Sequence, residues 1–188
     1  MDSISESSLV SEKRPNNFWE YTKTVLIAIA IVIPVRMYIA QPFIVEGASM
    51  EPNFQGGDYL IIDELSYQFR EPARGEVIVF RYPLNPSQFF IKRIVGLPGE
   101  EVQIRNGSIF ITGISGALKE PYLPNGLSTG PDLPLPLRLG PDQYFVLGDN
   151  RGHSSDSRVW GTLPSENITG RALVRLFPIT NIGFILQL

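Results

Sequence analysis

The stretch VQIRNGSIFI, residues 102–111, decides the fold class of this chain. Branched apolar residues recur on both sides of Asn106-Gly107, as they do in β-strands. An Asn-Gly pair between two such runs is the strongest short-range signal for a hairpin, because both residues readily adopt the positive φ of a type I′ turn. The stretch therefore predicts two antiparallel strands joined by a tight turn.

Short apolar runs and turn residues alternate throughout the chain from residue 41 onward. Helical periodicity is absent there, whereas β-branched and aromatic residues are frequent. Residues 113–143 are rich in Gly and Pro and predict an extended surface loop. We expect an all-β domain of antiparallel sheets over residues 41–188, either a sandwich or a partly open barrel. Its other main strands are predicted at Tyr59–Ile62, Glu76–Tyr82, Phe89–Val95, Tyr144–Leu147 and Ala172–Phe177.

The composition excludes several kinds of chemistry. The 188 residues carry a net charge of −3 and include no Cys and one His. Without Cys there is no disulfide, thiolate nucleophile or Cys-based zinc site, and His153 alone cannot form a two-His metal site. The lack of a basic block disfavours binding to nucleic acid. If the chain is a hydrolase, its general base is His153, a carboxylate or a lysine.

The N-terminal part predicts a membrane anchor. Residues 1–16 are polar and rich in Ser and Glu, which is typical of a disordered tail. Residues 17–40, NFWEYTKTVLIAIAIVIPVRMYIA, form the most apolar stretch. As a helix it would reach about 36 Å, enough to cross a hydrocarbon core of ~30 Å. We therefore expect a single transmembrane helix over residues 17–40.

The distribution of charge predicts the orientation of this anchor. Lys13, Arg14 and Lys23 lie on its N-terminal side, whereas residues 41–69 contain no Lys or Arg. The positive-inside rule then places the N-terminus in the cytoplasm and residues 41–188 outside. Two alternatives stay open for the same stretch: a signal peptide cleaved after Ala40, and a buried amphipathic helix.

Ser49 is the first candidate nucleophile. It lies in GASMEP, residues 47–52, directly after the apolar run Phe43-Ile44-Val45. Gly47 permits an unusual backbone conformation, and the small neighbouring residues leave Ser49 accessible to a bulky substrate. Taken alone, the pattern is more typical of a turn serine that bonds to its own backbone.

Lys92 is the candidate general base. In a strand, Phe90, Lys92 and Ile94 share one face, so the amine is held among apolar side chains. Burial disfavours the charged amine and lowers its pKa, which lets a lysine act as a base near neutral pH. The alternative is a lysine whose ammonium group reaches solvent from a half-buried strand.

Residues 148–158, GDNRGHSSDSR, form a polar segment after a predicted strand. They are either a solvated loop or a network in which Asp149, Asp156, Arg151 and Arg158 pair with one another. A Ser49–His153–Asp156 triad is disfavoured, because the G-x-S-x-G elbow is missing and no apolar residue fixes the His153 ring. A Ser49–Lys92 dyad is the alternative arrangement.

Three segments resemble conserved boxes of bacterial type I signal peptidases in order and spacing: GASMEP, FFIKRIVGLPGE and GDNRGHSSDSRVWG. A further segment, LKEPYL at residues 118–123, is also similar, and the resemblance extends over residues 17–180. It implies that Ser49 is the nucleophile and Lys92 the general base. It also implies that a hydrogen bond from Ser154 orients the lysine and that Asp156 and Arg158 form an ion pair, while Asp149 and Asn150 hold the shape of the loop.

The resemblance implies a β-rich catalytic domain outside the plasma (inner) membrane, anchored by one helix and acting as a monomer. Its substrate would be the signal peptide of an exported preprotein at the lipid bilayer, and no cofactor would be required. Small substrate residues at positions −1 and −3 would enter pockets lined by Phe43, Val45, Met50, Phe54, Phe90 and Ile91.

One position departs from part of the family. Some members carry a serine two residues before the nucleophile, whose hydroxyl helps to stabilise the oxyanion, whereas this chain has Gly47. The backbone N–H of Ser49 is then the expected main donor, and a second donor is not identified.

Two other functions share some of these features. A self-cleaving repressor uses a similar dyad, but it needs a DNA-binding helix-turn-helix and a basic surface. A membrane-anchored β-domain that binds partners without catalysis would be favoured if either dyad residue were missing. Both Ser49 and Lys92 are present.

Overall fold

The computed structural model describes residues 17–34 and 41–185 of the chain, which divides into two units at residue 35. The described part of the first unit is helix α1, Asn17–Pro34. No helix among the described residues is long and apolar enough to cross a membrane. The expected tail over residues 1–16 and the alternative cleavage point after Ala40 lie outside the described residues.

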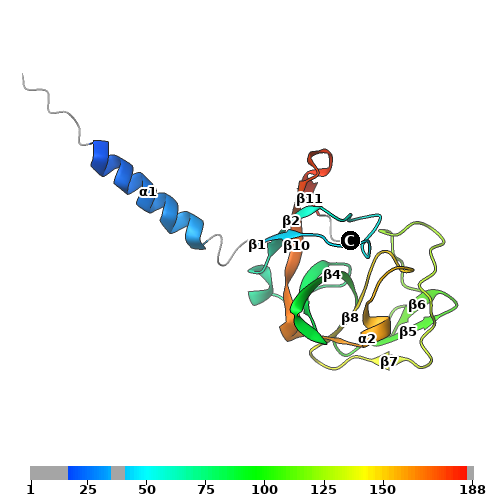
Figure 1. Cartoon of the computed structure of the whole chain (residues 1–188). Coiled ribbons are helices and arrows are strands. Elements are labelled where there is room, and N and C mark those ends of the chain that lie inside the picture. Colours follow the sequence, from blue (N-terminus) through cyan, green and yellow to red (C-terminus); the bar gives the residue numbers. More distant parts are fainter. Residues whose placement is uncertain (1–16, 35–40, 186–188) are drawn as a thin grey trace, which may run out of the picture. The chain divides into compact units, whose positions relative to one another are not determined.

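The second unit is built mainly from antiparallel strands, as predicted. Within the described residues, its larger sheet has the order β1-β2-β10-β3-β4-β8-β9, and β11 pairs with β10 (Figure 1). These strands are β1 Gln41–Ile44, β2 Tyr59–Asp63, β3 Val77–Tyr82, β4 Asn85–Gly96, β8 Gln143–Leu147, β9 Leu163–Pro164, β10 Ile168–Phe177 and β11 Gly183–Phe184. The short helical turns are η2 Ser66–Gln68, α2 Ser157–Trp160, η3 Ser165–Asn167 and η4 Ile179–Asn181.

A smaller sheet with the order β6-β5-β7 contains the hairpin that the sequence predicts. Its strands are β5 Glu101–Arg105, β6 Ser108–Ile111 and β7 Leu137–Arg138. Asn106 and Gly107 have φ values of 51° and 72°, and Arg105 is the register partner of Ser108. The positive φ at both central residues is what a type I′ turn requires.

The long Gly/Pro-rich segment follows the surface as predicted, but it contributes more than a loop. It supplies β7, which pairs with β5. Leu118, Leu133 and Leu137 pack against a hydrophobic cluster that also contains Ile104 and Phe145. The segment is therefore attached to the body of the domain.

Strand β4 is the element that positions the candidate site. It pairs with β3 on one side and with β8 on the other, so its second half lies inside the sheet. Residues 91–96 are all buried, because side chains cover both faces of the strand there. Two charged residues, Lys92 and Arg93, are thus held in the interior with exposures of 4% and 3%.

Gly96, the last residue of β4, provides a test of this packing. An added Cβ would lie 2.6 Å from Val102 Cγ2, 2.8 Å from Leu139 Cδ1 and 2.9 Å from Phe145 Cβ. We expect Gly96→Ala to lower the free energy of unfolding by about 1–3 kcal/mol, since an overpacked core must shift. Gly183→Ala is the control, because nothing lies within 4 Å of its added Cβ. Equal urea midpoints for the two variants would contradict this account.

Candidate active site

Ser49 lies in a loop, residues 45–58, that connects β1 to β2; we call it the nucleophile loop. The two ends of this loop are joined, since Val45 N–H donates to Asp58 O and Gly57 N–H donates to Val45 O, both at 2.9 Å. Val45, Met50 and Phe54 point into the core with exposures of 2%, 0% and 3%. These apolar side chains therefore anchor the loop to the core, while Ser49 itself is only partly buried.

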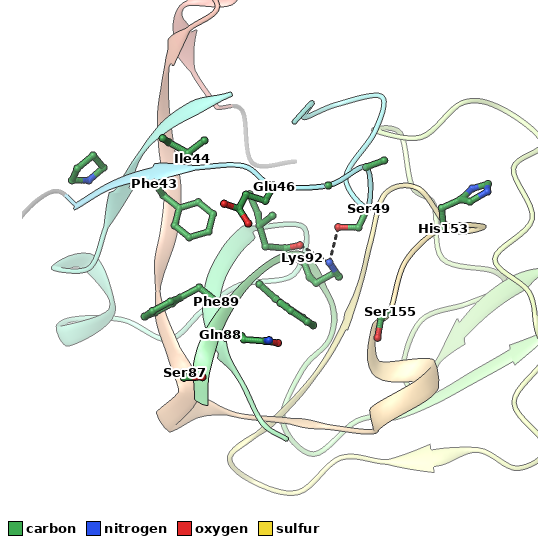
Figure 2. A pocket seen from close by; sticks show the side chains of 15 residues that line it. Phe43, Ile44, Glu46, Ser49, Ser87, Gln88, Phe89, Lys92, His153 and Ser155 are labelled. Atoms are coloured by element: carbon green, nitrogen blue, oxygen red, sulfur yellow. Dashed lines mark hydrogen bonds between the residues drawn. The ribbon is translucent and has the colours of Figure 1, made fainter. Parts of the chain in front are cut away.

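The structure brings Ser49 and Lys92 into direct contact, although they are 43 residues apart in sequence. Lys92 Nζ lies 2.7 Å from Ser49 Oγ and donates to Ile91 O at 2.9 Å. The Phe90 ring centroid lies 5.3 Å from the same nitrogen. Figure 2 shows the two side chains meeting at the wall of a pocket.

Burial changes the acidity of the Lys92 amine. The loss of solvent around the ammonium group lowers its pKa from 10.5 to about 8, while the nearby charges of Asp156 and Asp149 act in the opposite direction. At a pKa of about 8, roughly a tenth of the amine is neutral at pH 7. Lys92 can therefore accept a proton from Ser49 near neutral pH.

The polar segment 148–158 forms a loop that holds the backbone around Ser49; we call it the polar loop. The Asn150 N–H donates to Ser49 O, and Asn150 Nδ2 donates to Ala48 O, both at 3.0 Å. Asn150 thus donates hydrogen bonds to two consecutive carbonyl groups of the nucleophile loop. This is the contact through which the polar loop reaches the nucleophile.

Two buried carboxylates stabilise the polar loop. Asp156 forms the expected ion pair with Arg158 at 2.8 Å and accepts the Gly148 N–H at 3.1 Å. Asp149 does not pair within the loop but forms two hydrogen bonds with Arg93 of β4, at 2.8 and 2.7 Å. Arg93 was not among the candidate residues. The sequence feature that could have identified Arg93 is a second charged residue directly beside Lys92 in an otherwise apolar strand.

Ser154 does not make the expected hydrogen bond to Lys92 in this structure. Its Oγ is buried and has no hydrogen-bond partner among the described residues. The side chain packs against Gly148, where an added Cβ would overlap both Ser154 and the Ser49 carbonyl. Ser154 is therefore close to the site, with its hydroxyl unpaired.

His153 and Asp156 do not form a catalytic triad with Ser49. The His153 ring is exposed, and its Nδ1 lies 3.4 Å from Asn150 Oδ1. Asp156 is occupied by Arg158, and Ser49 by Lys92. In the part of the chain that is described, no group of three or more acidic or His residues could hold a metal ion.

The pocket beside the Ser49–Lys92 contact has a volume of about 940 Å³ and lies between β1 and the first half of β4. Of the six expected substrate-contacting residues, Phe43, Phe90 and Ile91 line it. The other three, Val45, Met50 and Phe54, are in the core beneath the nucleophile loop instead, because they anchor that loop. Glu46, Gln88, Phe89 and Ser155 line the pocket without having been anticipated.

Comparison with known proteins identifies the family of this chain. The family model described as signal peptidase, peptidase S26, matches residues 18–177. The chain belongs to this family. As a member of this family, the chain is a serine endopeptidase that removes signal peptides, which favours this function over a self-cleaving repressor or a binding domain without catalysis.

Two signal peptidases, from Synechocystis and Leptolyngbya laminosa, match most of the chain and support the same assignment. A probable signal peptidase I-2 from Synechocystis is 40% identical, and the match covers 97% of this chain and 84% of that protein. A signal peptidase I from Leptolyngbya laminosa is 37% identical, with coverage of 91% and 85%. A crystal structure of a signal peptidase I from Enterococcus faecalis is 31% identical, covers 54% of this chain and 97% of its own, and has a TM-score of 0.46.

The lowered pKa of Lys92 predicts a stability effect that needs no substrate. Between pH 8 and 10.5 the unfolded chain holds a proton on this amine that the folded chain does not, so folded-state stability rises with pH in that interval. The rise amounts to roughly 3 kcal/mol and is absent in Lys92→Met.

The measurement is the unfolding free energy of both proteins in urea between pH 7 and 11. We expect the wild type to gain about 3 kcal/mol relative to Lys92→Met across the interval. Parallel curves would show that Lys92 titrates as an ordinary exposed lysine.

Proposed function

We propose that the chain cleaves signal peptides from exported preproteins with a Ser49–Lys92 dyad, through an acyl-enzyme. The observation that carries this proposal is the 2.7 Å contact between Ser49 Oγ and a lysine amine that is 4% exposed. A serine hydroxyl is a weak nucleophile until a base removes its proton. Lys92 is the group placed to do so.

The reaction proceeds in two halves. Neutral Lys92 accepts the Ser49 proton as Oγ attacks the scissile carbonyl carbon, and the resulting ammonium gives that proton to the leaving amine as the peptide C–N bond breaks. In the second half, Lys92 accepts a proton from water, whose oxygen attacks the Ser49 ester. The ammonium then returns the proton to Ser49 Oγ, and the signal peptide leaves with a new carboxylate.

The oxyanion is stabilised by the backbone of the nucleophile loop. The Ser49 N–H has no hydrogen-bond partner among the described residues, so it is available to the developing negative charge. Gly47 has a φ of 77°, a conformation that favours glycine, and supplies no hydroxyl. The other Ser49 backbone group, its carbonyl, is held by Asn150.

The cleavage segment of the preprotein binds as an extended chain in the pocket. Among the described strands, β1 is at one end of the larger sheet, and its outer edge is one that an extended peptide can pair with. The residues at positions −1 and −3 face Phe43, Phe90 and Ile91, which leave room for small side chains. Pairing with the β1 edge would bring the scissile carbonyl to Ser49, which follows β1 in the chain.

The enzyme acts at a membrane. We place it as a single-pass protein of the plasma (inner) membrane, anchored by residues 17–40, with its N-terminus in the cytoplasm and its catalytic domain outside. The apolar composition of this stretch and the basic residues before it support this topology. The β10–β11 hairpin adds further apolar surface, since Phe177, Ile179, Ile182 and Phe184 are 54–77% exposed. The enzyme works as a monomer and binds no nucleic acid.

Replacement of Lys92 by arginine tests the dyad. A guanidinium group remains protonated at every working pH, so it cannot accept the Ser49 proton. We expect Lys92→Arg to be as inactive as Ser49→Ala in the cleavage of a purified preprotein, with the fold retained. Lys23→Arg is the matched control, because Lys23 is exposed in α1, keeps its charge and should keep wild-type activity. Wild-type turnover by Lys92→Arg would disprove the mechanism.

Replacement of His153, the one imidazole, tests the competing base. We expect His153→Ala to keep at least a tenth of wild-type kcat, since the ring is exposed and does not contact Ser49. The acidic limb of kcat/KM, set near pH 8 by Lys92, should also remain in this variant. If the acidic limb of kcat/KM were lost in His153→Ala, His153 rather than Lys92 would be the general base.

Removal of residues 1–40 tests the membrane anchor. The dyad lies wholly beyond them, so the shortened chain should cleave soluble peptides at the wild-type rate. Cleavage of preproteins embedded in vesicles should fall at least tenfold, because the anchor raises the effective concentration of enzyme near its substrate. Equal losses on both substrate types would show that residues 1–40 support the fold rather than the location.

A further inference from the structure

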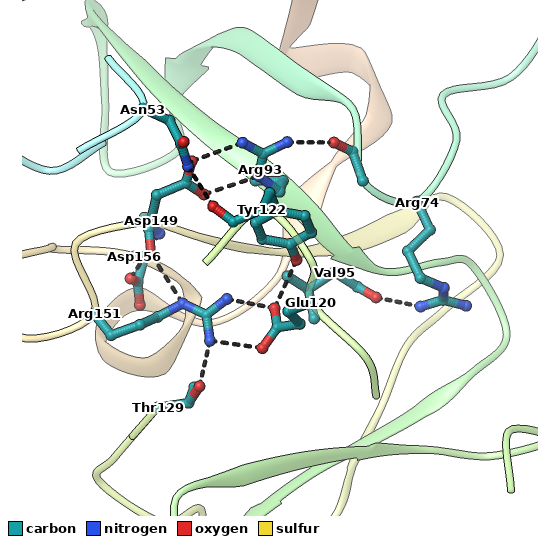
Figure 3. A network of polar contacts seen from close by, with 12 residues as sticks. Asn53, Arg74, Arg93, Val95, Glu120, Tyr122, Thr129, Asp149, Arg151 and Asp156 are labelled. Atoms are coloured by element: carbon teal, nitrogen blue, oxygen red, sulfur yellow. Dashed lines mark hydrogen bonds and ion pairs between the residues drawn. The ribbon is translucent and has the colours of Figure 1, made fainter. Parts of the chain in front are cut away.

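The segment Leu118–Leu123, LKEPYL, lies beside the active site; we call it the strap. It contacts the three parts of the chain that build the site: the nucleophile loop, strand β4 and the polar loop. Figure 3 shows Glu120 and Tyr122 of the strap inside one continuous network of polar contacts. The mechanism above assigns the strap no role.

Glu120 is the partner of a buried arginine in the polar loop. Its Oε2 accepts from Arg151 Nη1 at 3.1 Å, and its Oε1 is paired with Arg151 Nη2. Arg151 is 3% exposed, and its Nε donates to Gly148 O at 3.0 Å. Because a buried guanidinium without a carboxylate is costly, Glu120 keeps Arg151, and with it the backbone of the polar loop, in place.

Tyr122 connects the strap to the other two parts of the site. Its ring lies 4.0 Å from the guanidinium carbon of Arg93, the residue after Lys92 in β4. Its carbonyl accepts from Asn53 Nδ2 in the nucleophile loop at 2.8 Å. Burial and the neighbouring Glu120 raise the pKa of Tyr122, so its hydroxyl stays protonated and donates to Glu120 Oε1 at 2.6 Å.

The network reaches the reacting atoms through Asn150. This residue lies between Asp149, which binds Arg93, and Arg151, which binds Glu120. Asn150 in turn holds the carbonyls of Ala48 and Ser49. A shift of Arg151 would therefore move Asn150 and the Ser49 backbone relative to Lys92.

We propose that Glu120 is a positioning residue: through Arg151 and Asn150 it holds Ser49 at hydrogen-bond distance from Lys92. This inference rests on the proposed Ser49–Lys92 mechanism. Displacement of a nucleophile by about 1 Å can cost ~100-fold in rate, whereas the pocket that binds the peptide is unchanged. Loss of Glu120 should therefore lower kcat and leave KM nearly constant.

The test compares Glu120→Gln with Glu76→Gln in the full-length protein. Glu76 is a matched control: it is 5% exposed, pairs with Arg70 and accepts from the Tyr67 hydroxyl at 2.9 Å, but it does not contact the polar loop or the strap. We expect Glu120→Gln to lower kcat 10- to 100-fold with KM within threefold. Glu76→Gln should leave kcat within twofold at a temperature where both variants are folded.

A double-mutant cycle separates positioning from a general loss of structure. Because Glu120 acts through Arg151, Arg151→Met should also lower kcat, and Glu120→Gln combined with Arg151→Met should lose little more kcat than Arg151→Met alone. Losses of kcat that simply multiply in the double variant would contradict the positioning role. If Glu120→Gln does not fold, Tyr122→Phe decides the question. This variant keeps the ring on Arg93 but loses the hydroxyl that orients Glu120, and a two- to tenfold lower kcat is expected.

Ser49→Ala in the same assay keeps the two claims apart. If Ser49→Ala still cleaves, the proposed function is wrong. If Ser49→Ala is inactive while folded Glu120→Gln or Tyr122→Phe retains wild-type kcat, the strap does not position the nucleophile and the dyad stands. Equal losses of kcat in Glu120→Gln and Glu76→Gln would also overturn the positioning role.

Discussion

The burial of one amine, Lys92 Nζ, beside one hydroxyl, Ser49 Oγ, is the constraint on which the site depends. A lysine amine in water is almost fully protonated at neutral pH and cannot act as a base. In this fold it is 4% exposed, and its pKa falls to about 8. Because burial disfavours the charged ammonium form, the Lys92 amine can accept a proton near neutral pH, and it does so next to the Ser49 hydroxyl.

The surrounding structure keeps that amine in place without neutralising the effect. Strand β4 pairs with β3 at Lys92 and with β8 from Arg93 onward, so the backbone that carries Lys92 is fixed within the sheet. The two carboxylates whose charges raise its pKa, Asp149 and Asp156, are each paired with an arginine. Those pairs limit how far the carboxylates raise the pKa of Lys92, which remains well below that of a free lysine. The two ion pairs therefore stabilise the polar loop while the pKa of Lys92 stays low enough for it to act as a base.

The features that the sequence predicted correctly are those that depend on residues close together in the chain. The Asn106-Gly107 hairpin and the face shared by Phe90, Lys92 and Ile94 follow from the sequence alone. The roles of Ser49, Asp156 and Arg158 came from family resemblance, and the contacts of all three are present. Contacts between distant segments, such as Arg93–Asp149 and Glu120–Arg151, could not be read from spacing. The Ser154 hydrogen bond to Lys92 was expected and is not formed, since the Ser154 Oγ has no hydrogen-bond partner among the described residues.

The most direct test is a titration of Lys92 itself. The chain has four lysines, so carbon-13 labelling of the lysine side chains gives four Cε signals, and the one missing in Lys92→Arg belongs to Lys92. The account predicts that this signal titrates with a pKa of about 8, well below the ~10.4 of a lysine in a model peptide. A pKa above 10 for Lys92 in the folded protein would contradict the claim that burial makes it the general base.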